Sequence, residues 1–89
     1  MVTETQTKAL AESESFMAAA QAVADFFYGK TVDEIVWGDE APGEVATLMA
    51  AVRQEITAAG CSEFLEFDDE RLYTEVILTL VLRRLRSAL

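Results

Sequence analysis

The side chains in this sequence that could carry chemistry are carboxylates, gathered at a few points along the chain. General acid or base catalysis by a carboxylic acid needs one group held away from water, so that it keeps its proton near neutral pH. The acids here lie at the expected beginnings of helices, where solvent and the helix dipole favour the charged form. We therefore expect exposed capping groups that form an acidic binding face for a partner. The face is expected to contain Asp39, Glu40, Glu44, Glu63, Glu66, Asp68, Asp69 and Glu70.

Most other catalytic and cofactor chemistry is excluded by residues that the sequence lacks. There is no histidine, so neither a Ser-His-Asp triad nor a histidine zinc site can form. The single cysteine, Cys61, cannot build a four-cysteine zinc site or a Cys-x-x-Cys redox pair within one chain. The four glycines are too scattered for a nucleotide-binding loop, and residues 68–75 lack the alternating acids and the glycine of an EF-hand. We expect no enzyme activity, no cofactor and no metal site.

One short segment is loosely similar to a cofactor-attachment motif. Gly60-Cys61-Ser62-Glu63-Phe64 resembles the Asp-Ser-Leu motif of small acidic helical carrier proteins, which attach phosphopantetheine to the serine at a helix start. The resemblance implies attachment at Ser62. However, the aspartate and the leucine of the motif are both absent, and Ser62 lies too near the carboxyl end for the later helices of that family. We therefore interpret Ser62 as a helix cap.

The charge of the chain is acidic and unevenly distributed. The 89 residues carry a net charge of −9, and 52 % of them are hydrophobic, which favours a single folded domain. Residues 1–70 contain 15 acids and three basic residues, a balance of −12, whereas residues 71–89 contain four arginines and Glu75, a balance of +3. An acidic body repels nucleic-acid phosphates and anionic membranes and attracts basic protein surfaces. We expect a protein partner with a basic surface, and no direct binding to nucleic acid or membranes.

Three features of the sequence indicate a cytoplasmic location: the amino terminus, the longest apolar run and the cysteine content. The first 15 residues lack the basic and continuous apolar regions of a signal peptide. The longest strongly apolar run, Val76 to Leu82, has seven residues. A membrane-spanning helix needs roughly 20. A single cysteine cannot form an intramolecular disulfide, so nothing points to an oxidising compartment.

Apolar spacing and capping signals predict an all-α fold, a small helical bundle of three main helices plus one or two short helices. The main helices are expected over residues 12–28, 42–60 and 69–87, and the short ones over 31–37 and 61–67. Residues 1–11 are polar and are expected to form a flexible N-terminal tail, which leaves residues 12–89 as the single helical domain. The β-branched run within residues 76–82 would also suit a strand, but the chain offers no comparable strand to pair with it.

The helix expected at the carboxyl end is apolar nearly all the way round, and such a helix has to be buried on all sides. It is either the central helix of the core, or it is covered in part by a second copy of the chain or by a partner helix. The second interpretation predicts a homodimer. Its oligomer or partner contact is expected to contain Trp37, Tyr73, Ile77, Leu80 and Val81.

These features favour a non-enzymatic protein–protein interaction module, an accessory, regulatory or inhibitory subunit that docks its acidic face on a basic partner surface. Two alternatives stay open. In the first, the acidic face imitates the phosphate backbone and inhibits a nucleic-acid-binding protein, as small phage-encoded inhibitors do, a resemblance of composition alone. In the second, the apolar C-terminal helix is a permanent subunit contact in a larger assembly.

Overall fold

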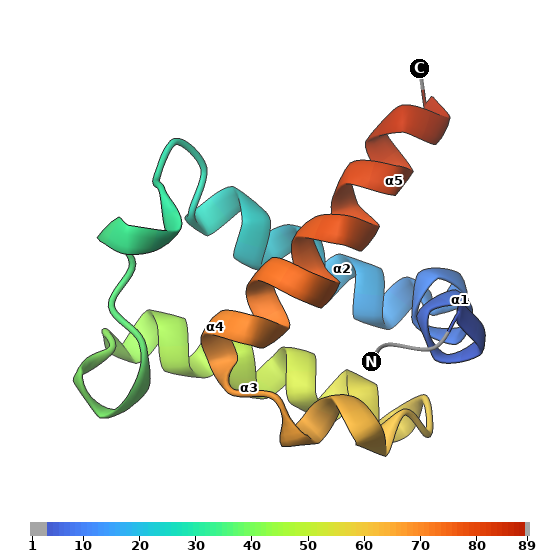
Figure 1. Ribbon diagram of the computed structural model, residues 1–89, viewed down its shortest axis with the longest axis horizontal. Helices are drawn as coiled ribbons and strands as arrows, with labels where there is room; N and C mark the ends of the chain where they lie inside the picture. The colour runs from blue at the N-terminus through green and yellow to red at the C-terminus, as the bar shows by residue number, and fades with distance from the viewer. Residues whose placement is uncertain (1–3, 89) are drawn as a thin grey trace.

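The computed structural model describes residues 4–88, and within this range the fold is all-α without a β-strand, as predicted (Figure 1). The α-helices are α1 (Glu4–Glu12), α2 (Glu14–Phe26), α3 (Gly43–Ala58), α4 (Asp69–Leu72) and α5 (Leu78–Ala88). A π-helical turn, η4 (Tyr73–Ile77), joins α4 to α5. Short 3₁₀ turns lie between the longer helices: η1 (Val32–Glu34), η2 (Gly38–Glu40) and η3 (Ser62–Glu66).

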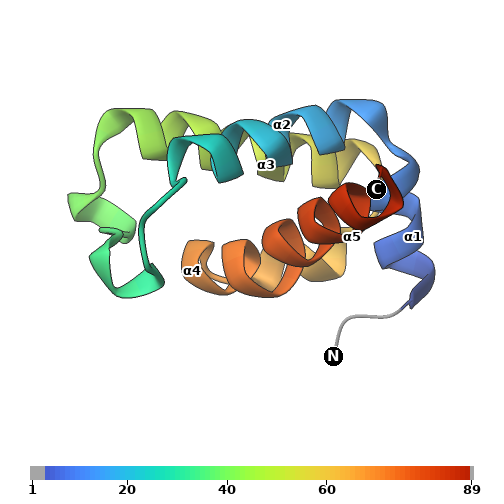
Figure 2. The ribbon, with the colours of Figure 1, turned by 90° about the horizontal axis from the view of Figure 1, so that it is seen from above.

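Helices α2 and α3 lie side by side and form one layer, and α4 and α5 cross this layer as a continuous rod (Figure 2). Helix α2 begins where the Ser13 hydroxyl oxygen accepts a hydrogen bond from the Phe16 N–H at 3.1 Å, which satisfies one orphan donor of the first turn. Helix α3 starts directly after Pro42 and ends before Gly60, whose φ of +76° suits a glycine. The facing stripes of both helices are buried: Phe16, Met17, Ala20 and Val23 on α2, and Val45, Met49, Val52 and Ile56 on α3.

The segment expected to be a flexible tail forms helix α1 over its described part, while residues 1–3 lie outside the described residues. Leu10 has no exposed surface and Thr7 is 8 % exposed, so one face of α1 packs into the core. These two residues are three apart and therefore share a helix face. Leu10 is the one strongly apolar residue of α1, which is a weak signal in the sequence, and its burial against the other helices orders this helix.

The C-terminal segment is helical, as predicted, and one side of it is buried against α2 in the core. Its inward residues come in adjacent pairs four positions apart: Leu72 with Tyr73, Val76 with Ile77, and Leu80 with Val81. A spacing of four drifts around a regular α-helix, which has 3.6 residues per turn. In the π turn, the Leu78 N–H donates to the Tyr73 carbonyl five residues back, and this wider turn keeps the three pairs on one side.

A single side chain, Arg53 of α3, ties α3 to the segment that leads into α4. Its guanidinium donates to the carbonyl oxygens of Leu65 at 3.1 Å and Phe67 at 2.7 Å. The same group donates to Asp69 Oδ1 at 3.1 and 2.8 Å, which makes an ion pair whose two side chains are 30 % and 29 % exposed. Charge-assisted hydrogen bonds shielded in this way are stronger than those of a fully exposed pair. Arg53 thus positions the connection between two main helices.

Replacing Arg53 is expected to destabilise the fold. Arg53→Met keeps the aliphatic stem but leaves two partly buried carbonyls and Asp69 without their donor, so the free energy of unfolding should fall by about 2 kcal/mol. Urea denaturation followed by circular dichroism measures the change. The matched control, Arg86→Met, alters an exposed arginine near the end of α5 and should change stability by less than about 0.5 kcal/mol. Equal effects of the two substitutions would contradict the structural role of Arg53.

Candidate functional site

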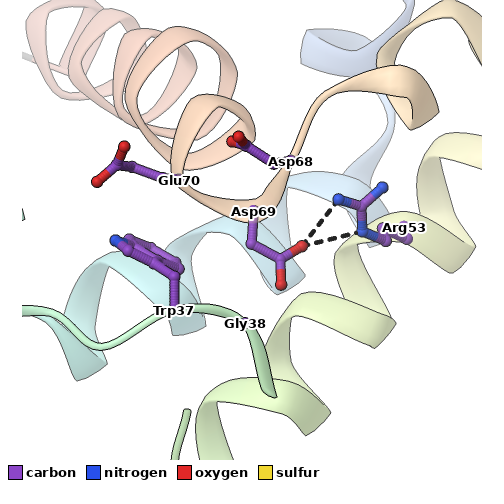
Figure 3. A pocket seen from close by; sticks show the side chains of 6 residues that line it. All are labelled: Trp37, Gly38, Arg53, Asp68, Asp69 and Glu70. Carbon is purple, nitrogen blue, oxygen red and sulfur yellow. Dashed lines mark hydrogen bonds and ion pairs between the residues drawn. The ribbon is translucent and has the colours of Figure 1, made fainter. Parts of the chain in front are cut away.

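A pocket of about 530 Å³ opens where the loop before α3 meets the beginning of α4 (Figure 3). Its volume falls within the roughly 300–1,000 Å³ that is usual for ligand pockets. Trp37 and Gly38 come from the loop, Arg53 from α3, and Asp68, Asp69 and Glu70 from the start of α4. The pocket therefore combines an aromatic wall with three carboxylates and one guanidinium.

Trp37 is held in place by an aromatic cluster beneath the pocket. Its ring centroid lies 5.4 Å from that of Phe27 and 5.6 Å from that of Tyr73, and the rings of Phe27 and Tyr73 are themselves 5.2 Å apart. Such tilted and edge-to-face pairs stabilise by about 0.5–1.5 kcal/mol each beyond their buried area. The indole Nε1–H is buried and has no hydrogen-bond partner within residues 4–88. The indole is therefore fixed in orientation by packing against Phe27 and Tyr73.

The three pocket carboxylates have different surroundings. Asp69 is paired with Arg53, and Asp68 caps α4 by accepting a hydrogen bond from the Arg71 N–H at 2.8 Å. Glu70 is exposed, and its carboxylate makes no hydrogen bond or ion pair to any described residue. Arg71 is also engaged elsewhere, because its side chain pairs with Glu75 and lies over the Phe67 ring at 3.9 Å. The pocket thus retains two uncompensated negative charges, one of them on a carboxylate without a partner.

The structure brings together only some of the predicted acidic face. Asp68, Asp69 and Glu70 share the pocket, whereas Glu63 and Glu66 line a separate hollow with Phe64 and Phe67. Glu44 lines a third hollow beside Phe26 and Leu48, and Glu40 is exposed in η2. The side chain of Asp39 lies outside the described residues. Three of the eight predicted acids therefore form one site.

Four of the five residues predicted to form an apolar contact are buried, so they do not form a surface in this fold. Tyr73, Ile77, Leu80 and Val81 are at most 5 % exposed, because they face α2 and the aromatic cluster of the same chain. Trp37, expected at the end of a short helix, lies beyond η1 in the loop and belongs to the pocket with the acids. The large apolar side chains of α5 that stay exposed are Leu82 and Leu85, at 51 % and 53 %.

Two other expectations about single residues need correction or addition. Ser62 is the first residue of η3, and no side-chain hydrogen bond caps that turn, so Ser62 does not act as the predicted cap. Arg53 is a site residue that the predicted acidic and apolar contacts do not include, although it lies next to the buried Val52 on α3 and is the sole basic residue between Lys30 and Arg71. An isolated cation beside a buried stripe, in an acidic stretch, is the sequence signal that marks it.

The other chemical groups of residues 4–88 are weaker candidates for a functional site than the pocket is. Within residues 4–88, no three His, Cys, Asp or Glu side chains are placed to hold a metal ion, and no helix has the length and apolarity to cross a membrane. Cys61 is a buried thiol whose Sγ lies 3.7 Å from the Gln6 carbonyl oxygen. Burial, with a smaller effect of Glu63, raises the pKa of this thiol. A raised pKa opposes formation of the reactive thiolate.

Comparisons with known proteins add no family to this description. No protein-family model matches the chain, and neither a curated protein nor a solved structure shows significant similarity to it. The pocket and the distribution of charge are therefore the features of this chain that indicate a function.

The pKa of Tyr73, raised by burial, predicts a loss of stability at high pH. Between the ordinary tyrosine pKa of about 10 and the raised folded value, the unfolded chain releases the proton that the folded chain retains. The free energy of unfolding should therefore fall as the pH rises through about 10, and urea titrations at several pH values measure it.

Two tyrosine variants separate this effect from other groups that titrate at high pH. Tyr73→Phe should remove the share of the pH dependence due to Tyr73, whereas Tyr28→Phe, at a position 89 % exposed, should retain it. Cys61 acts in the same direction from a lower pH and is common to both variants. An unchanged pH profile in Tyr73→Phe would rule out the assignment.

Proposed function

We propose that this chain is a non-enzymatic interaction protein that docks an acidic face, centred on the Trp37 pocket, onto a basic surface of a partner protein. The single observation that carries the proposal is the pocket itself, in which an oriented indole lies beside two uncompensated carboxylate charges. Tryptophan at a concave, partly solvent-excluded position is a frequent anchor of protein interfaces. Negative charge around such an anchor selects basic partners and accelerates their association.

The distribution of basic residues supports the same proposal. Arg83, Arg84 and Arg86 are exposed on α5, where Arg83 and Arg84 line hollows with Glu14 of α2 and none of the three arginines lines the Trp37 pocket. They make no ion pair with a described acid, so the acidic surface near the pocket is not neutralised by them. The proposal places the interaction in the cytoplasm, where a free thiol such as Cys61 stays reduced.

Capture of partners on two matched charge variants tests the proposed docking face. The face variant combines Glu40→Gln, Glu44→Gln and Glu70→Gln, and the control combines Glu12→Gln, Glu14→Gln and Asp25→Asn on α1 and α2. Both lose three charges. Basic proteins captured from a lysate of the source cell by the wild type, and released by high salt, should be lost about tenfold from the face variant and retained by the control. Equal retention by both variants would contradict the proposed face.

The same captured complexes discriminate the DNA-mimic alternative. If the acidic face imitates a phosphate backbone, duplex DNA should release the partner at low salt, because both ligands occupy the nucleic-acid site of that partner. Ordinary docking on a basic surface outside such a site predicts that the partner stays bound when the duplex is added.

A second candidate function has an observation of its own. Leu82 and Leu85 are half exposed on α5 and lie three residues apart, on one face of the helix. Exposed leucines at this spacing suit a helix contact with a second copy of the chain or with a neighbouring subunit. We therefore retain a homodimer or assembly contact through α5 as the alternative, with these two leucines in place of the buried residues.

Light scattering at increasing protein concentration tests the α5 contact. A homodimer should have twice the chain mass of 9.8 kDa and should persist in high salt, because the contact is apolar. Leu82→Lys combined with Leu85→Lys should then return the protein to the mass of one chain without unfolding it, since both positions are exposed. A mass of 9.8 kDa for the wild type at every concentration would remove the homodimer.

A further inference from the structure

We propose that the Trp37 pocket binds the guanidinium group of one arginine side chain, held between the Trp37 indole and the Glu70 carboxylate. This inference rests on the proposed function and specifies it, since the arginine belongs to the basic surface of the partner. It identifies the chemical group that the pocket recognises, and it distinguishes a specific subsite from a general attraction between opposite charges.

The positions of the side chains around the pocket separate it into two halves (Figure 3). In one half, Arg53 and Asp69 neutralise each other at 2.8 Å. In the other half, Trp37 and Glu70 lie together on the side away from Arg53. The guanidinium of a bound arginine in the Trp37–Glu70 half would contact the indole and the unpaired Glu70 carboxylate. It would also lie away from Arg53, which carries the same charge.

The chemistry of the second half favours a cation. An indole ring attracts a cation placed over its face, and the attraction increases where water is excluded. The Trp37 ring cannot turn away, because Phe27 and Tyr73 pack against it. Glu70 is exposed and has no partner among the described residues, so its carboxylate is available to a ligand. A neutral ligand would lack the charge attraction to both groups, and an anionic ligand would be repelled by the Glu70 carboxylate.

Arginine fits this half better than lysine for geometric reasons. A guanidinium is planar, stacks on an aromatic ring with one face and still directs its N–H donors to a carboxylate at its edge. An ammonium group is a compact, strongly hydrated charge that gains less from stacking. Gly38 adds room at the pocket wall, because a Cβ built there meets no atom within 4 Å. Its φ of +78° also disfavours any larger residue at that position.

Nuclear magnetic resonance of the ¹⁵N-labelled full chain tests the proposal directly. Trp37 is the sole tryptophan, so its indole N–H gives one assigned signal that reports on the pocket. The probes are N-acetyl-arginine amide, the lysine analogue and the citrulline analogue, each titrated at constant ionic strength. Citrulline has nearly the shape of arginine without the charge. We expect a saturable shift of the indole signal with the arginine probe, weaker binding of lysine, and no saturable shift with citrulline.

Two variants with the same net charge distinguish binding at the subsite from general attraction between opposite charges. Glu70→Gln and Glu63→Gln each remove one exposed acid, but only Glu70 lines the pocket. Glu70→Gln should weaken binding of the arginine probe about fivefold, in line with the loss of one partly exposed charge pair, whereas Glu63→Gln should leave it unchanged. The backbone signals of both variants, recorded in the same spectra, show that the fold is intact.

Each result supports or overturns the proposal. Equal weakening by the two variants, equal shifts with arginine and citrulline, or no saturable shift would overturn the arginine subsite. If salt-sensitive capture of a basic protein on the acidic face still occurs in that case, the proposed function stands and this inference alone fails. Conversely, if the arginine probe binds but no partner protein is captured, the subsite is supported and the proposed docking function is contradicted.

Discussion

The bonds that Arg53 makes are the constraint on which the arrangement of the pocket depends. One guanidinium joins α3 to two carbonyl oxygens before α4 and to a carboxylate inside α4, so that the connection between the two helices is held at several points. Asp69 forms an ion pair with Arg53, and its neighbours in sequence, Asp68 and Glu70, are exposed around the beginning of α4. This ion pair therefore leaves Asp68 and Glu70 as the pocket acids whose charge no basic side chain of residues 4–88 neutralises.

The aromatic cluster connects this charged site to the hydrophobic core. Phe27 and Tyr73 are buried, and Trp37 lies over them at the boundary between core and solvent. The pocket wall is thus an extension of the core rather than a flexible loop feature. A ligand that stacks on Trp37 meets a surface already ordered by packing, so little conformational entropy is lost on binding.

The sequence predicts the helices where spacing and capping agree, and it fails where long-range packing decides. Helices α2 and α3 follow from regular apolar stripes, with Pro42 and Gly60 at the ends of α3, and the acids of α4 follow from capping chemistry. The order of α1 depends on burial of Leu10 by distant helices, which local spacing cannot show. Trp37 and Glu70 are neighbours only after folding, so the sequence pattern assigns Trp37 to an apolar contact and Glu70 to an acidic face, although both line the same pocket.

The π turn between α4 and α5 has a consequence for how this fold tolerates change in chain length. Each residue of an α-helix turns the chain by about 100°. Loss of one residue from the regular helix Leu78–Ala88 would rotate the residues that follow by about that angle. Loss of one residue from Tyr73–Ile77 would instead convert the π turn to an α-helical turn and leave the direction of α5 nearly unchanged, because the wider turn is an α-helical turn that holds one extra residue. The π turn is therefore the place in this rod where the chain can shorten by one residue while the arginines and leucines of α5 keep their orientation relative to the pocket.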